Sequence, residues 1–114
     1  MNPALPSQPQ YGLILTTTGS CEEAETIAQV LLEEHLAACV NYFEIKSLYR
    51  WQGEIHKDPE WQLIIKTNLE QQNAIESRIS ALHSYKLPEF LVIPFQGGSE
   101  VYLQWLGQQV PSRA

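Results

Sequence analysis

The chain has 114 residues, of which 44% are hydrophobic, and a formal net charge of -6. This length fits one domain with one core. The acidic balance, without any cluster of Lys or Arg, excludes nucleic acid as a favourable partner and suits cations instead. No apolar run approaches the roughly 18 residues that a membrane-spanning helix needs, so no transmembrane segment is expected.

The cysteine content and the first residues indicate a compartment. Cys21 and Cys39 form neither a C-x-x-C pair nor a disulfide framework, and the start MNPALPSQPQ lacks the pattern of a secretory signal. We therefore expect a cytoplasmic protein with reduced thiols. Residues 1–10 contain three prolines among polar residues and predict a flexible arm. The domain is then expected over residues 11–108, with a tail over residues 109–114.

The first predicted strand and helix follow the arm directly. Residues 11–17, YGLILTT, are apolar and too few for a helix, which predicts a buried central strand. Ser20 lies three residues before Glu23, the spacing of a capping box at a helix start. This helix is expected to end near His35. One apolar stripe should face the sheet, formed by Ala24, Ile27, Ala28, Leu31 and Leu32.

A long hairpin is predicted next. The pattern from 36 to 51 is that of a strand, and the turn WQGE, with Gly53 able to take a positive φ, reverses the chain. Pro59 cannot donate to a strand ladder, so it predicts a bulge or an unpaired segment. The return strand should place Trp61, Leu63, Ile65 and Thr67 on one face, and Gln62, Ile64 and Lys66 on the other.

The remaining elements complete a known order. Asn68 predicts the cap of a second helix, with Gln71 at its third position. Residues 90–95, FLVIPF, predict a fourth strand, which Pro94 confines to a sheet edge. A last helix after Ser99 should cover that edge with Tyr102, Trp105 and Leu106. The order β-α-β-β-α-β plus a terminal helix predicts an α+β protein of the ferredoxin-like fold.

Few residues indicate chemistry by themselves. Lys66 stands in mid-sheet, where a lysine needs an acidic partner or a ligand unless it reaches the solvent. Tyr49 and Trp51 share a strand face near the hairpin tip, where they either bind a ligand or pack on a neighbour. No Ser-His-Asp order, nucleotide fingerprint or paired-carboxylate motif is present. In so small a chain, a ligand site forms more easily in a cleft between copies.

The cysteines and two of the histidines do not suggest a site. Cys21 falls in the first turn of the first helix, where the neighbouring glutamates oppose a thiolate. Cys39 is expected to be a small apolar residue of the core. His35, at a helix end, and His56, in the hairpin, lack the spacing of metal ligands. A strong metal site within one chain is therefore not expected.

Five segments together resemble the CutA family of divalent-cation tolerance proteins. They are LAACVN (36–41), SLYRWQGEI (47–55), IIKT (64–67), HSYKLPE (83–89) and YLQWL (102–106). The resemblance covers about residues 11–108. It implies a stable homotrimer of ferredoxin-like subunits, joined through the long hairpin and the terminal helix. It also implies tolerance to copper and other divalent cations, clefts between subunits as in the PII signalling proteins, and no enzymatic activity.

The same resemblance bears on metal binding. The copper ligands attributed to a bacterial family member are a cysteine at the end of the first strand and two adjacent histidines. These positions correspond to Thr16, Leu82 and His83 here, so only His83 is retained. A hydroxyl and an aliphatic side chain cannot replace a thiolate and an imidazole. We therefore expect at most weak binding of Cu(II) or another divalent cation, through imidazoles and carboxylates, and no other cofactor.

The loop HSYKLPEF, residues 83–90, is interpreted as the rim of a ligand cleft between subunits. The predicted cleft residues are Lys66 as its floor with Glu60, Tyr85, Lys86, Glu89, Tyr49 and Trp51 around it. The expected ligand is a divalent cation or a small anion. Two other hypotheses remain at this point: a small enzyme that uses His83 and Tyr85 as acid and base, and a module that only binds other proteins.

Overall fold

The computed structural model describes residues 10–112, so the predicted N-terminal arm lies almost entirely outside the described residues. The elements are β1 (Tyr11–Thr18), α1 (Cys21–Glu33), β2 (Cys39–Trp51), β3 (Glu54–Asn68), a 3-10 turn (Leu69–Gln71), α2 (Gln72–Leu82), β4 (Leu91–Pro94) and α3 (Glu100–Gln109). This is the predicted β-α-β-β-α-β order with an additional C-terminal helix.

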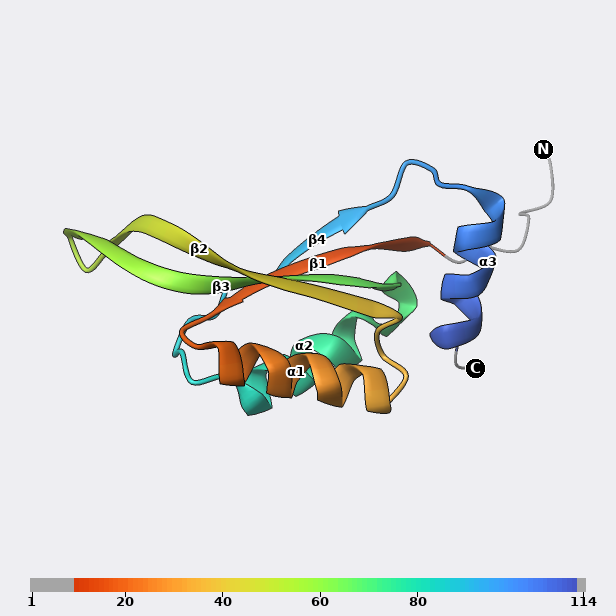
Figure 1. The fold of residues 1–114 in the computed structure, drawn as a ribbon, viewed down its shortest axis with the longest axis horizontal. Coiled ribbons are helices and arrows are strands. Elements are labelled where there is room, and N and C mark those ends of the chain that lie inside the picture. The colour runs from red at the N-terminus through yellow and green to blue at the C-terminus, as the bar shows by residue number, and fades with distance from the viewer. Residues whose placement is uncertain (1–9, 113–114) are drawn as a thin grey trace, which may run out of the picture.

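The four strands form one antiparallel sheet in the order β2-β3-β1-β4. Helices α1 and α2 cover one face of this sheet, and no helix of residues 10–112 covers the other face (Figure 1). The prediction of β1 as a central strand is confirmed. The prediction of β4 as an edge strand is confirmed as well, because Pro94 pairs with Gly12 of β1 at the side of the sheet. The fold is ferredoxin-like, as expected.

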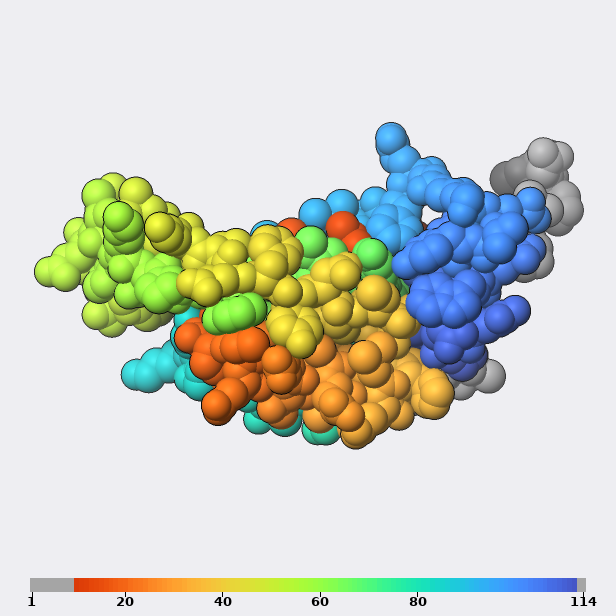
Figure 2. Space-filling model, viewed as in Figure 1, coloured from red at the N-terminus to blue at the C-terminus, as the bar shows by residue number. Residues whose placement is uncertain are grey.

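The β2–β3 hairpin extends well beyond the rest of the sheet (Figures 1 and 2). Its turn uses positive φ angles at Gln52 and Gly53. Of the two alternatives predicted for Pro59, the bulge is wrong, because the β2–β3 register continues through the pair Lys46–Pro59, while the unpaired segment holds for one edge of the strand. The other edge of β3 pairs with β1 only as far as Trp61. Pro59 therefore lies where β3 has a single described neighbour, so its missing N–H does not interrupt a second ladder.

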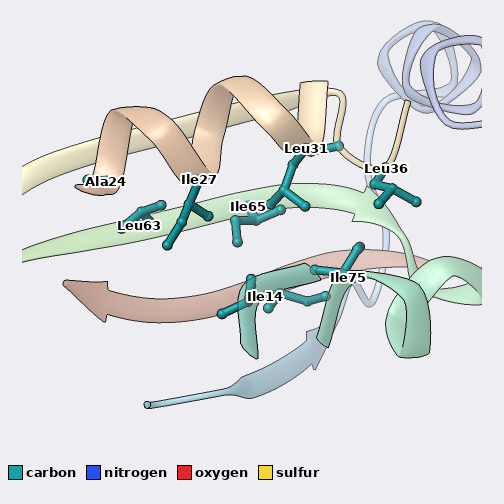
Figure 3. Close-up of a cluster of buried hydrophobic side chains, with 10 residues drawn as sticks. Ile14, Ala24, Ile27, Leu31, Leu36, Leu63, Ile65 and Ile75 are labelled. Carbon is teal, nitrogen blue, oxygen red and sulfur yellow. The ribbon is translucent and has the colours of Figure 1, made fainter. Parts of the chain in front are cut away.

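The core lies between the sheet and the two covering helices (Figure 3). Its fully buried side chains include Ile14, Ile27, Leu31, Leu63, Ile65, Ile75 and Ile79. Leu63, Ile65 and Thr67 are buried while Gln62, Ile64 and Lys66 are only half-buried, which confirms the predicted faces of β3. Two expectations fail. Leu32 is 42% exposed rather than part of the packing stripe, and Cys39 is half-buried beside Lys66 rather than in the core.

The helix starts follow the predicted caps with two differences. Ser20 accepts a 3.1 Å hydrogen bond from the Glu23 N–H, but the Glu23 carboxylate accepts from Ser84 instead of completing the capping box. Asn68 caps the 3-10 turn through a 3.0 Å bond from the Glu70 N–H, one turn before α2. Gln71 does not reach back to Asn68; its Nε2 donates to the Pro111 carbonyl instead. The Gln71 side chain therefore binds the segment after α3 instead of taking part in the cap at Asn68.

Helix α3 packs at the end of the sheet rather than along the edge of β4 (Figure 1). Leu106 is buried as predicted, together with Val110, whereas Tyr102 and Trp105 stay about two-fifths exposed. The Asn68 side chain donates to the Val110 carbonyl and thereby ties the end of α3 to the end of β3. Within residues 10–112, no helix combines the length and apolar character needed to cross a membrane.

Candidate functional site

A pocket of about 500 Å³ lies where the hairpin leaves the body of the domain. Three parts of the chain build it: the end of β1, the hairpin strands, and the loop between α2 and β4. Its lining residues are Thr17, Tyr49, Trp51, Gln52, Glu60, Tyr85, Lys86, Leu87 and Glu89. The pocket is thus formed by a single chain, whereas the sequence predicted a cleft between subunits.

Six of the seven predicted cleft residues line this pocket, namely Glu60, Tyr85, Lys86, Glu89, Tyr49 and Trp51. Strand periodicity explains part of this agreement. Tyr49 and Trp51 are two residues apart on β2 and share its helix-free face. Thr17, Gln52 and Leu87 were not predicted. These three side chains come from the end of β1, the hairpin turn and the loop, and only the tertiary fold brings these segments together.

Lys66 is the predicted cleft residue that does not line this pocket. It shares a face of β3 with Glu60, but lies six residues further along the strand. At about 3.3 Å per residue this separates the two residues by about 20 Å. Lys66 pairs instead with Leu13 of β1 and Cys39 of β2. Within one chain, therefore, Lys66 cannot form the floor beside Glu60.

Tyr85 and Glu60 join the loop to β3 inside the pocket. The Tyr85 hydroxyl donates a 2.9 Å hydrogen bond to Glu60 Oε2. Burial first, and then the bonded Glu60 carboxylate, raise the pKa of Tyr85 well above its usual range. Tyr85 therefore stays protonated at neutral pH. It acts as a fixed donor to Glu60, which is only 9% exposed.

Tyr49 is held in a similar way on the hairpin side. Its hydroxyl donates to Asp58 on the neighbouring strand β3, and its ring stacks on His56 with the centroids 5.6 Å apart. The hydrogen bond to Asp58 raises the pKa of Tyr49, with burial as the next cause. His56 thus supports an aromatic wall of the pocket, and within residues 10–112 it belongs to no group of three metal-ligating side chains.

His83 fixes the start of the loop and has no ring nitrogen to spare. Its Nδ1 accepts a 3.0 Å hydrogen bond from the Tyr85 N–H. Its Nε2 lies 2.6 Å from the Thr17 carbonyl oxygen, which can only accept, so Nε2 carries the proton. A metal ligand needs a free nitrogen lone pair. In this conformation His83 positions the loop, and both of its ring nitrogens are engaged within the chain.

Two more contacts hold the loop and its exit. Glu23 accepts from the Ser84 N–H at 2.7 Å and from the Ser84 hydroxyl at 3.1 Å. Glu89 Oε2 accepts a 3.2 Å bond from Gln62 Nε2, which also donates to the Thr16 carbonyl. No pattern in the sequence signals these pairs, because the partners lie tens of residues apart. The loop is therefore held against both α1 and the sheet.

A preformed metal centre is not found among residues 10–112, where no three His, Cys, Asp or Glu side chains gather. Thr16 is fully buried, and its hydroxyl has no hydrogen-bond partner within the described part of the chain. Cys21 donates to Glu25, and burial raises the pKa of its thiol, with Glu25 adding to the effect. Neither residue is thereby suited to bind a soft metal ion.

The charges in the pocket favour cations. Glu60 and Glu89 contribute two carboxylates, and Lys86 is the single basic residue that lines the pocket. Asp58 adds a third carboxylate directly behind Tyr49. Because Lys66 does not line this pocket, the pocket of one chain carries more negative than positive charge, and the small-anion ligand expected between subunits stays a prediction.

Comparison with known proteins agrees with this architecture. Residues 12–109 match the family described as "CutA1 divalent ion tolerance protein". A similar relative is the divalent-cation tolerance protein CutA of Thermus thermophilus, 44% identical over 95 residues, or 82% of this chain and 92% of the relative. The protein of the same name from Archaeoglobus fulgidus is 41% identical over 100 residues, or 88% of this chain and 98% of the relative.

Solved structures show the same fold. The periplasmic divalent cation tolerance protein CutA from Archaeoglobus fulgidus has a TM-score of 0.86 and covers 88% of this chain and 98% of its own. CutA1 from Oryza sativa has a TM-score of 0.88 at 33% identity, with coverage of 92% and 97%. The family description names tolerance of divalent ions and no reaction. By its sequence and its fold, this chain belongs to the CutA1 divalent ion tolerance protein family.

Proposed function

We propose that the protein is a non-enzymatic homotrimer of the cytoplasm that binds cations in its pocket and so serves divalent-cation tolerance. The observation that carries this proposal is the pair of carboxylates, Glu60 and Glu89, in a pocket with a single lysine. The names of the similar proteins, which refer to divalent-cation tolerance, support the same role. Two free cysteines in the described residues suit the cytoplasm.

The helix-free face of the sheet supports the trimer. Strand pairing places Phe43, Leu91 and Ile93 on this face, and they are 45%, 53% and 46% exposed. On the opposite face of the projecting hairpin, Leu48 and Ile55 are even more exposed. Apolar side chains gathered in this way on a small domain are typical of a surface that other subunits cover. The expected trimer would bury them.

Two observations support a binding role over an acid and base mechanism. Both ring nitrogens of His83 are engaged in hydrogen bonds within the chain. The pKa of Tyr85 is raised by burial and by Glu60, so its hydroxyl does not exchange a proton readily near neutral pH. An acid and base pair needs a group poised near the working pH, and this pair does not provide one.

Divalent cations are expected to bind weakly. Two carboxylates from one chain fill only part of the coordination sphere that Mg²⁺ or Ca²⁺ requires. Cu(II) binds imidazole well, and no imidazole lines the pocket. Copper binding should therefore depend on Glu60 and Glu89 and should weaken when the salt concentration rises.

Light scattering and calorimetry test the proposal together. Light scattering at micromolar concentration should give three times the 13.0 kDa chain mass. Calorimetry with Cu(II) should show weak binding that the double variant Glu60→Gln, Glu89→Gln removes. Glu76→Gln, which changes an exposed carboxylate of α2 outside the pocket, is the matched control and should bind normally. A monomer, or copper binding unaffected by the double variant, would contradict the proposal.

A further inference from the structure

Three aromatic side chains line the pocket from two separate segments of the chain. Tyr49 and Trp51 come from β2, and Tyr85 comes from the loop after α2. Two of the rings are supported from behind by imidazoles. Tyr49 stacks on His56, and the Tyr85 ring centroid lies 4.8 Å from that of His83. The pocket therefore has firm aromatic walls rather than flexible aliphatic ones.

One carboxylate of the pocket lacks a positive partner. Glu60 is nine-tenths buried, and within residues 10–112 its carboxylate receives one hydrogen bond, from Tyr85, and no ion pair. A buried carboxylate with a single donor is poorly compensated. Glu89 has one oxygen bonded to Gln62 and lines the same pocket. A ligand with positive charge would supply the charged partner that both carboxylates lack.

The combination of rings and carboxylates selects among cations. A bare divalent ion needs many oxygen ligands and gains little from aromatic walls that displace its water. An organic ammonium cation interacts favourably with both the aromatic rings and the carboxylates. Its charge is attracted by the ring faces of Tyr and Trp and by the carboxylates, and its carbon atoms bury apolar surface.

We propose that the pocket binds a small organic ammonium cation between Tyr49, Trp51 and Tyr85, with Glu60 and Glu89 as its counter-charges. This inference rests on the proposed function as a cation-binding protein and names the chemical class of the ligand. Lys86 opposes such a ligand. It is exposed and makes no hydrogen bond or ion pair within the described residues, so it can turn toward the solvent when a cation enters.

The test is calorimetric titration of the whole protein with two cations and their neutral analogues. Choline is compared with 3,3-dimethyl-1-butanol, in which carbon replaces the charged nitrogen. Ethanolammonium is compared with 1-propanol, in which a methyl group replaces the ammonium. We expect at least one of the cations to bind and its analogue to bind more than about tenfold more weakly, because the analogue keeps the shape and loses the charge.

Pocket variants, each with a matched control, locate the site. Trp51→Leu should weaken binding of the cation about fivefold to thirtyfold, the range expected for one cation–π contact. Trp105→Leu, on the exposed face of α3, should not change it. Glu60→Gln keeps an acceptor for Tyr85 and removes the charge, so binding should fall about tenfold or more. Glu76→Gln, on the exposed side of α2, should bind as the unaltered protein does.

The Lys86→Gln variant distinguishes a specific effect on cation binding from general damage to the fold. This change removes the opposing charge at an exposed position, so cation binding should become about threefold tighter. General damage to the fold cannot tighten binding. Equal binding of cations and analogues, no binding of either cation, or insensitivity to Trp51, Glu60 and Lys86 would overturn the inference. A trimer that binds copper but neither ammonium ion would overturn it and leave the proposed function intact.

Discussion

The Tyr85 hydroxyl donates a 2.9 Å hydrogen bond to Glu60 Oε2, and this bond joins residues that are 25 positions apart. It connects the loop of residues 83–90 to the strand that runs into the hairpin. Together with burial, this bond keeps Tyr85 protonated, and it is the one hydrogen bond that the Glu60 carboxylate receives within residues 10–112. The pocket therefore depends on a contact between two of its own walls.

Stability should fall at alkaline pH because of Tyr85. Burial, followed by Glu60, raises the pKa of Tyr85 above its ordinary value of 10.0, so the folded state holds this proton more tightly than the unfolded state. The resulting stabilisation is fully present below about pH 10 and is lost as the pH rises through the higher pKa of the folded protein. Urea unfolding between pH 8 and pH 12 should show this decline.

Tyr85→Phe should make the decline above pH 10 shallower. Tyr42 and Tyr49 also have raised pKa values, through Glu25 and Asp58 respectively, and both remain in the variant. The difference between the two proteins therefore isolates Tyr85. Tyr102→Phe, at an exposed tyrosine of α3, is the control. The same slope in the Tyr85→Phe variant and the unaltered protein would contradict the prediction.

Removing His83 should cost stability rather than copper affinity. In His83→Ala the Thr17 carbonyl and the Tyr85 N–H lose their partners, which should lower the free energy of unfolding by about 1–2 kcal/mol. Copper affinity should change by less than about threefold, since neither ring nitrogen is free. Calorimetry and urea unfolding measure the two effects. Nanomolar copper binding that this change abolishes would show that His83 is a ligand.

Gly12 should not accept a side chain. A Cβ atom at Gly12 would lie 2.5 Å from the Ile93 carbonyl oxygen and 2.9 Å from Leu69 Cδ1. The first neighbour is backbone of the paired strand β4, which can move only by loosening the sheet. Gly12→Ala should therefore destabilise the protein by about 1–3 kcal/mol in thermal unfolding.

A matched glycine provides the control for that experiment. A Cβ atom at Gly97 would meet nothing within 4 Å, so Gly97→Ala should change stability by less than about 0.5 kcal/mol. If both alanine variants unfold at the same temperature, the close approach of β1 and β4 at Gly12 is not a structural requirement.

Asn68 should be needed to hold the end of α3. Its side chain is 1% exposed and donates to the Val110 carbonyl at 3.2 Å and to the Ser112 hydroxyl at 3.1 Å. Asn68→Asp keeps the cap on Glu70 and replaces this donor by a carboxylate. Loss of the donor should lower the free energy of unfolding by about 1–3 kcal/mol. Asn73→Asp, at a position of α2 outside the core, should have no comparable effect in the same urea titration.

Several features followed from local patterns in the sequence. Alternation along residues 61–67 predicted the buried and open faces of β3, and Ser20 with Glu23 predicted the start of α1. Pro94 predicted an edge strand. These succeed because periodicity, capping and the missing proline N–H act within a few residues. The family resemblance extended these local predictions to the whole fold and to most residues of the pocket.

The tertiary structure decided what depends on distant partners. It showed that both nitrogens of His83 are occupied, one of them by a carbonyl 66 positions away, and that Lys66 lies far from Glu60 on the same face. It also gathered six of the predicted cleft residues in a pocket of one chain, where carboxylates outnumber the single lysine. The side chains that can share a pocket are set by strand register and loop path, which residue type alone does not reveal.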